Sequence, residues 1–97
     1  MGKILYLIVN EDKAGIDLAL ENNEDDVTIL LLQDAVYFAT KKGTEISQAL
    51  QQNKKVFVSQ ADVTLRGIQN MVQEGVQNTD YGGIIDITFT CDTIINF

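Results

Sequence analysis

Short apolar runs of strand length recur along the chain. Residues 3–9 (KILYLIV) and 27–33 (VTILLLQ) are almost continuously apolar, which is typical of parallel strands that helices cover on both faces. Residues 54–59 (KKVFVS) have the same character. Together with two shorter segments, these runs predict five strands, near residues 3–9, 27–33, 54–59, 75–79 and 93–97.

Residues at helical spacing fill the intervals between these strands. Residues 13–22 predict a first helix, and residues 35–50 predict a second that is interrupted at residues 41–44. Gly67 is a weak point inside a third predicted helix. That helix rests on the spacing of four apolar residues: Leu65, Ile68, Met71 and Val72.

The segment 84–90 is rich in β-branched residues, so propensity alone allows a strand there. Periodicity favours a helix, with Thr79 or Asp80 as its cap. The apolar positions fall at i, i+3, i+4, i+7 and i+8, on Tyr81, Ile84, Ile85, Thr88 and Phe89.

The alternation of strands and helices predicts the fold class. It is an α/β three-layer sandwich with a five-stranded parallel sheet and right-handed crossovers, flavodoxin-like or Rossmann-like. Ninety-seven residues with 45% apolar content suffice for one core, so residues 1–97 are expected to form a single domain.

Charge and composition exclude several functions. A net charge of -7 repels phosphate backbones and anionic membranes, so we expect no direct nucleic-acid binding and no membrane association. No apolar run approaches the length of a membrane span, which predicts a cytoplasmic protein. The chain has no histidine and one cysteine, which removes imidazole bases, internal disulfides and structural zinc, so no metal is expected.

Candidate site residues follow the strands, because ligands gather at the carboxyl ends of strands in open parallel sheets. Asp34 is also expected to cap a helix that begins at Ala35, and Ser59 has an alternative interpretation as an ordinary loop hydroxyl. The predicted cleft consists of Asn10, Asp34, Ser59 and Gln60, beside the turn at residues 78–80.

A phosphoacceptor or small-molecule binding module is one alternative, with Asn10, Asp12 and Asp34 as its polar groups. Against a phosphoacceptor, Ser59 ends the third strand, where such a domain needs an aspartate. The loop after the first strand has a single glycine, so no nucleotide cofactor is expected.

Cys91 is the only thiol, between the last helix and the last strand. Free cysteine is among the most buried residue types, which favours a packing role. The adjacent Asp92 would disfavour the thiolate that a reactive cysteine needs.

Three segments resemble one family. Residues 30–36 resemble the Asp-(Gly/Ala)-Val turn of the DsrE/DsrF/DsrH (TusB/TusC/TusD-like) sulfur-relay family, especially its DsrH/TusB branch. Residues 56–67 resemble the family segment that ends in Leu-Arg-Arg-Gly, and residues 75–97 resemble the tail of the TusD branch. The resemblance spans nearly the whole chain and implies the same three-layer fold.

The resemblance also implies a role in sulfur transfer. Family members form trimers or hexamers, and some carry sulfur as a cysteine persulfide, toward tRNA 2-thiouridine synthesis or in sulfur oxidation. That cysteine stands eight residues before the glycine of the Leu-Arg-Arg-Gly element, a position that Ser59 occupies here relative to Gly67. Cys91 matches a cysteine of the TusD tail and not the sulfur carrier.

The leading hypothesis is therefore a non-catalytic or regulatory subunit of a sulfur-relay assembly. Its expected partners are further copies of itself or DsrE/F-like paralogues, with no cofactor. A sulfurtransferase that uses Cys91 is the alternative enzyme hypothesis. Tyr37, Phe38 and Phe97 are apolar residues expected to lie exposed in the lone chain and to be covered by another subunit.

Overall fold

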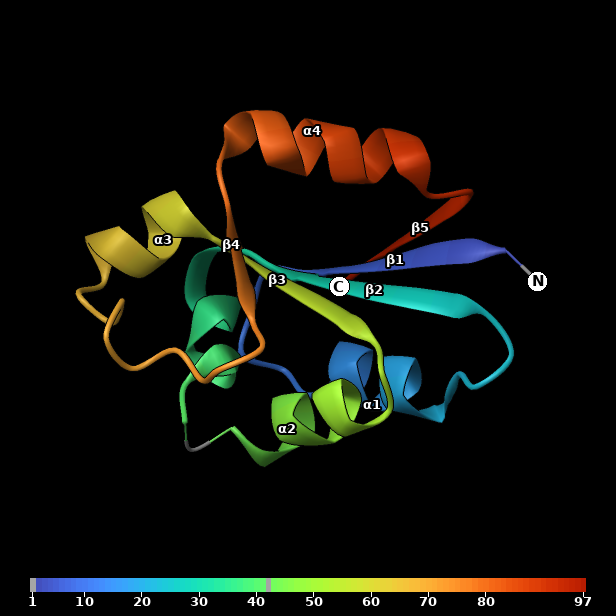
Figure 1. The fold of residues 1–97 in the computed structure, drawn as a ribbon, viewed down its shortest axis with the longest axis horizontal. Coiled ribbons are helices and arrows are strands. Elements are labelled where there is room, and N and C mark those ends of the chain that lie inside the picture. The colour runs from blue at the N-terminus through green and yellow to red at the C-terminus, as the bar shows by residue number, and fades with distance from the viewer. Residues whose placement is uncertain (1, 42) are drawn as a thin grey trace.

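The computed structural model describes residues 2–41 and 43–97 and contains a five-stranded, all-parallel sheet (Figure 1). This confirms the predicted fold class, and the strand ends lie within two residues of their predicted positions. The strands are β1 (Lys3–Ile8), β2 (Asp26–Leu31), β3 (Lys55–Ser59), β4 (Gln77–Thr79) and β5 (Thr93–Asn96), in the sheet order β4-β3-β2-β1-β5.

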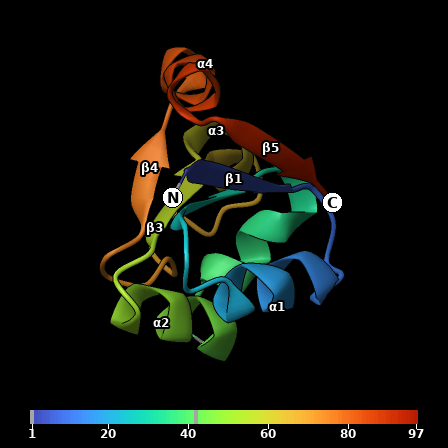
Figure 2. The ribbon, with the colours of Figure 1, turned by 90° about the vertical axis from the view of Figure 1, so that its right-hand side faces the viewer.

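Helices cover both faces of the sheet, which makes three layers (Figure 2). One face carries α1 (Ala14–Glu21), the 3-10 helix η1 (Gln33–Ala39) and α2 (Thr44–Gln51). The other face carries α4 (Tyr81–Thr90), which connects β4 to β5. The short helix α3 (Gln60–Leu65) follows β3 and packs against η1 and β3.

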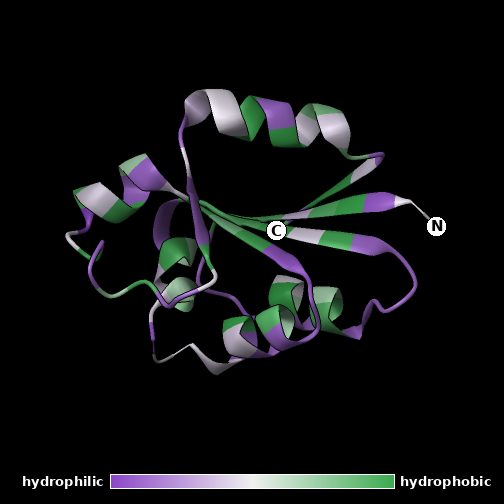
Figure 3. Ribbon diagram, in the orientation of Figure 1, coloured by the Kyte–Doolittle hydropathy of each residue, from purple (hydrophilic) through white to green (hydrophobic). Residues whose placement is uncertain are grey.

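Side chains are buried more completely on one face of the sheet than on the other. Side chains that alternate along β1, β2 and β3 join α1, η1 and α2 in one continuous core, and the apolar colouring of Figure 3 follows these elements. On the opposite face, Leu5 and Leu30 are fully buried. No residue of α4 itself is buried, so the layer on this face is thin.

Phe38 and Phe97, predicted to be exposed, are instead partly buried against the core. The ring of Phe97 occupies the space beside Gly15, where a side-chain carbon would come within 2.7 Å of it. Tyr37 is 43% exposed, as predicted.

The segment 81–90 forms a helix, as periodicity predicted, and Asp80 caps it by accepting a hydrogen bond from the amide of Gly83 (2.8 Å). The predicted apolar stripe, however, is only partly the buried side of this helix. Ile84 and Thr88 of the stripe are half-buried, together with Ile87 from outside it, whereas Tyr81 and Phe89 are 78% and 84% exposed.

The prediction that Asp34 caps a helix at Ala35 was wrong. The segment is the 3-10 helix η1, which begins one residue before Asp34, and no side chain caps it. Gln33 has a φ of 53°, so the chain turns sharply out of β2 at this point. The carboxylate of Asp34 is directed to Arg66 instead.

The predicted third helix, through Leu65 to Val72, was also wrong. The helix ends at Leu65 because Gly67 takes a left-handed φ of 66°. The amide of Gly67 donates to the carbonyl of Thr64 (3.0 Å) and that of Ile68 to the carbonyl of Val63 (3.2 Å), a Schellman motif. Gly67 therefore terminates the helix and is not a weak point inside it.

Candidate functional site

A cavity of about 510 Å³ lies at the carboxyl edge of the sheet, between α3 and the start of α4. Two predicted positions, Gln60 and the turn at residues 78–80, are brought together here. The lining residues are Gln60, Ala61, Thr64, Leu65, Asp80 and Tyr81.

Ser59 lies at the junction of β3 and α3, next to this cavity. Its hydroxyl oxygen accepts a hydrogen bond from the amide of Asp62 (3.4 Å) and so caps α3. The residue is only 6% exposed. The alternative interpretation of Ser59 as an ordinary loop hydroxyl therefore gives way to a buried capping role.

Asp34 belongs to a charged cluster with Asp62 and Arg66, beside α3. One of its carboxylate oxygens accepts hydrogen bonds from Nη2 (2.8 Å) and Nε (3.2 Å) of Arg66. The hydrogen bond to Asp34 raises the pKa of Arg66 above its usual value, with smaller support from the charge of Asp62. Arg66 also donates from Nη1 to a carboxylate oxygen of Asp62 (3.4 Å).

Asp62 connects this cluster to the bend after β2. Its second carboxylate oxygen accepts a hydrogen bond from the amide of Gln33 (2.9 Å), the residue with positive φ. Asp62 and Arg66 were missed as site residues, although their i, i+4 spacing was a usable signal. The cluster fixes η1 against α3 and therefore shapes the edge that holds the cavity.

Asn10 does not join the cavity. Its side-chain oxygen accepts a hydrogen bond from the amide of Asp12 (2.9 Å), and Asp12 accepts one from the amide of Ala14 (3.0 Å). Both side chains are occupied in the turn that leads into α1. Because Asp34 is paired with Arg66, the structure does not favour a phosphoacceptor pocket made of Asn10, Asp12 and Asp34.

Cys91 is half-buried at the opposite end of α4 from the cavity. Ten helical residues separate the two ends of α4, which corresponds to about 15 Å. The only thiol of the chain therefore lies at the other end of α4 from the cavity that adjoins Ser59.

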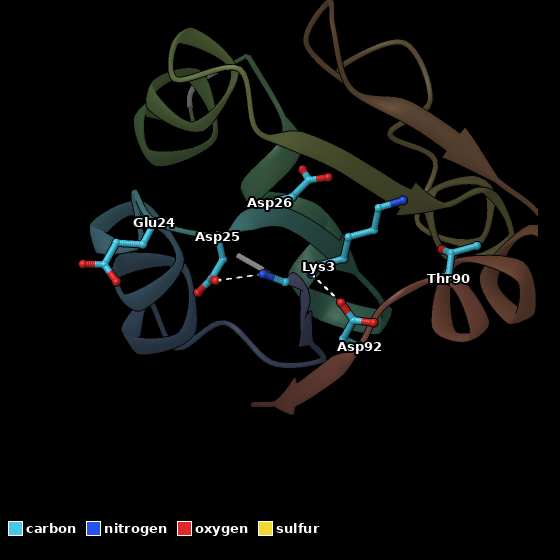
Figure 4. A pocket seen from close by; sticks show the side chains of 7 residues that line it. Lys3, Glu24, Asp25, Asp26, Thr90 and Asp92 are labelled. Atoms are coloured by element: carbon cyan, nitrogen blue, oxygen red, sulfur yellow. Dashed lines mark hydrogen bonds between the residues drawn. The ribbon is translucent and has the colours of Figure 1, made fainter.

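A larger hollow of about 690 Å³ lies at the amino edge of the sheet (Figure 4). Two of its carboxylates bind backbone amides at the start of β1. Asp25 accepts a hydrogen bond from the amide of Gly2 (3.2 Å), and Asp92 accepts one from the amide of Lys3 (2.9 Å). Across residues 2–41 and 43–97, no group of three or more metal-binding side chains could hold a metal ion.

Within the part of the chain that the structure describes, no helix has the length and apolar character needed to cross a membrane.

The fold and this edge define a class: a small parallel α/β domain whose candidate site lies around the helix after the third strand. A family model described as "DsrH like protein" matches residues 11–94. Proteins named TusB from Yersinia pestis (strain Pestoides F) and Yersinia pseudotuberculosis serotype O:1b (strain IP 31758) are each 34% identical to the chain over 71 residues. The match covers 73% of this chain and 73% of each relative.

Two solved structures share the fold over the full length of both chains. The ychN protein from E. coli gives a TM-score of 0.88 at 18% identity. MTH1491 from Methanobacterium thermoautotrophicum gives 0.81 at 12% identity. The chain belongs to the DsrH-like family, within the DsrE/DsrF/DsrH sulfur-relay group, as the resemblance predicted.

Proposed function

We propose that this chain is a non-catalytic or regulatory subunit of an intracellular sulfur-relay assembly, serving tRNA 2-thiouridine synthesis or sulfur oxidation. Its partners are DsrE/F-like paralogues that carry the relay cysteine. The observation that supports this most directly is Ser59: the residue at the carrier position is a buried hydroxyl that caps α3. A serine hydroxyl cannot hold a transferable sulfane sulfur.

The alternative, sulfur transfer through Cys91, has less support. Persulfide transfer needs a thiolate that can attack and be attacked in the open, with positive charge nearby. Cys91 is half-buried and is followed by Asp92. In addition, no basic residue lies in the last turn of α4, so that turn supplies none of the positive charge that persulfide transfer needs.

Sulfur loading tests the proposal. The purified chain is incubated with a cysteine desulfurase and ³⁵S-labelled cysteine, and protein-bound label is measured with and without reductant. We expect little label on the wild type and on Cys91→Ser. Strong, reductant-sensitive labelling of the wild type that disappears in Cys91→Ser would make this chain a transferase and refute the proposal.

Ser59→Cys is the matched gain-of-function variant, made in the Cys91→Ser background so that only one thiol is present. The position is the last residue of β3 and precedes the amides of α3, which favour an anion. Ser59 is only 6% exposed, so loading requires that the surrounding site keeps the family's shape and opens to the desulfurase; if it does, this variant accepts label. A folded Ser59→Cys protein that accepts none would show that the surrounding site, and not only the cysteine, differs from that of the sulfur carriers.

A further inference from the structure

The outer side of α4 carries a row of apolar side chains that no other described residue buries. Tyr81, Ile85 and Phe89 stand at i, i+4 and i+8, so they line up along the helix. They are 78%, 38% and 84% exposed. Leu65 of α3, which is 80% exposed, lines the same cavity as Tyr81. These four residues are called the α4 strip below.

The composition of the α4 strip is that of an interface. Aromatic side chains are enriched at protein interfaces and supply most of their strongly contributing residues. Singly exposed apolar residues are ordinary, but four that adjoin one another form a contiguous patch. In the part of the chain that the structure describes, α4 covers this face and buries none of its own residues, whereas α1, η1 and α2 together cover the other face (Figure 2).

The charges around the α4 strip are predominantly negative. Residues 67–97 contain no lysine or arginine, and their four acidic residues, all exposed, are Glu74, Asp80, Asp86 and Asp92. Arg66, the nearest cation in sequence, is held by Asp34 and Asp62. Lys3 lines the hollow that Thr90 at the end of α4 also lines, but four carboxylates line the same hollow: those of Glu24, Asp25, Asp26 and Asp92.

This charge pattern distinguishes between two possible occupants. A second copy packed symmetrically on the α4 strip would place acidic residues against acidic residues, between chains that each carry a net charge of -7. A partner whose apolar patch is bordered by lysine and arginine would meet the same surface with opposite charge.

We propose that the α4 strip is the docking surface for a subunit of different sequence, a cysteine-bearing DsrE/F-like paralogue with a basic border around an apolar patch. The inference rests on the proposed function, because the relay assembly supplies this partner. It adds which surface of the chain makes the contact and which charge the partner presents.

The test uses the cysteine-bearing paralogues that the same genome encodes. Each paralogue is co-expressed with the chain, and native mass spectrometry detects the complex. A titration of the purified proteins then measures the affinity. Tyr81→Asp/Phe89→Asp changes the two most exposed aromatic residues of α4 and should weaken binding by about 100-fold or more. Leu18→Asp, an exposed apolar residue of α1 on the other face of the sheet, is the matched control and should change affinity by less than about threefold.

Charge is tested separately with Asp86→Lys, an exposed position in the middle of α4. This variant should bind the paralogue more weakly, and raising the salt concentration should weaken the wild type but affect Asp86→Lys less. Circular dichroism establishes that each variant is folded before its affinity is compared.

Other outcomes separate this inference from the proposed function. Binding that survives Tyr81→Asp/Phe89→Asp would refute the surface while the relay role stands. A tight homo-oligomer that this double variant dissociates would refute the choice of partner. If the wild type binds none of the paralogues, the proposed function fails and this inference fails with it.

Discussion

Lys54 is a buried lysine without a carboxylate partner, and replacing it tests how the amino edge of the sheet is held. Its side chain is largely buried, and the residue is 8% exposed. The ammonium donates hydrogen bonds to the carbonyl of Leu20 (3.2 Å), to Oδ1 of Asn23 (3.4 Å) and to Oε1 of Gln52. Leu20 lies in the last turn of α1, which has no basic residue of its own. Lys54, the residue before β3, therefore supplies the cation that favours a helix carboxyl end.

Lys54→Met keeps the aliphatic bulk and removes the three donors. A hydrogen bond from a charged group contributes roughly 1.5–3 kcal/mol, and an orphaned buried carbonyl such as that of Leu20 costs roughly 1–3 kcal/mol. Relief from burying a charge offsets part of this loss. We expect the free energy of unfolding to fall by about 2 kcal/mol, which lowers the Tm by roughly 8–16 °C in a domain of this size.

Lys55→Met is the matched control, because Lys55 is the next residue and its side chain is exposed. Its free energy of unfolding should change by less than about 0.5 kcal/mol. Urea unfolding at pH 7, followed by circular dichroism, measures both variants. Equal stability of Lys54→Met and the wild type would refute the reasoning.

The pH dependence gives a second check. Burial lowers the pKa of Lys54 below its ordinary value. At a pH between the pKa of Lys54 in the folded chain and its pKa in the unfolded chain, the unfolded chain binds more protons. The free energy of unfolding therefore rises with pH in this window. The gain is lost as the pH falls through the folded pKa. The gap between the wild type and Lys54→Met should therefore widen from pH 7 toward pH 10. A gap that narrows would mean that the hydrogen bonds to the charged form outweigh burial.

Two further substitutions test the edge that holds the candidate site. Asp62→Ala should lower the free energy of unfolding by about 1 kcal/mol, because it removes the acceptor of the exposed amide of Gln33. Asp62→Asn, which keeps an acceptor, should lose less than half of this in the same urea experiment. Gly67→Ala should lower the free energy of unfolding by about 1 kcal/mol in thermal unfolding. The cause is the positive φ alone, since no atom lies within 4 Å of the added carbon. Gly82→Ala, in the first turn of α4, is the control and should not lower the free energy of unfolding.

Local patterns in the sequence determined the strands and the last helix. The apolar runs of β1, β2 and β3 are continuous because both of their faces are covered, so residue type alone identified them. The helix at residues 81–90 followed from periodicity and from Asp80, whose capping partner lies three residues away. Ser59 was likewise placed at the end of a strand from the chain alone.

Two features depended on the tertiary structure alone. One is the set of contacts between residues that are distant in sequence, and the other is which side of a helix is buried. Asp34 pairs with Arg66, 32 residues away, so a capping rule that considers neighbours in sequence assigned it the wrong partner. Periodicity located an apolar row on α4, but a row of this kind faces either the sheet or a partner. Ile84 and Thr88 of this row are half-buried, whereas Tyr81 and Phe89 are exposed, because the position of α4 depends on where β4 and β5 hold its ends.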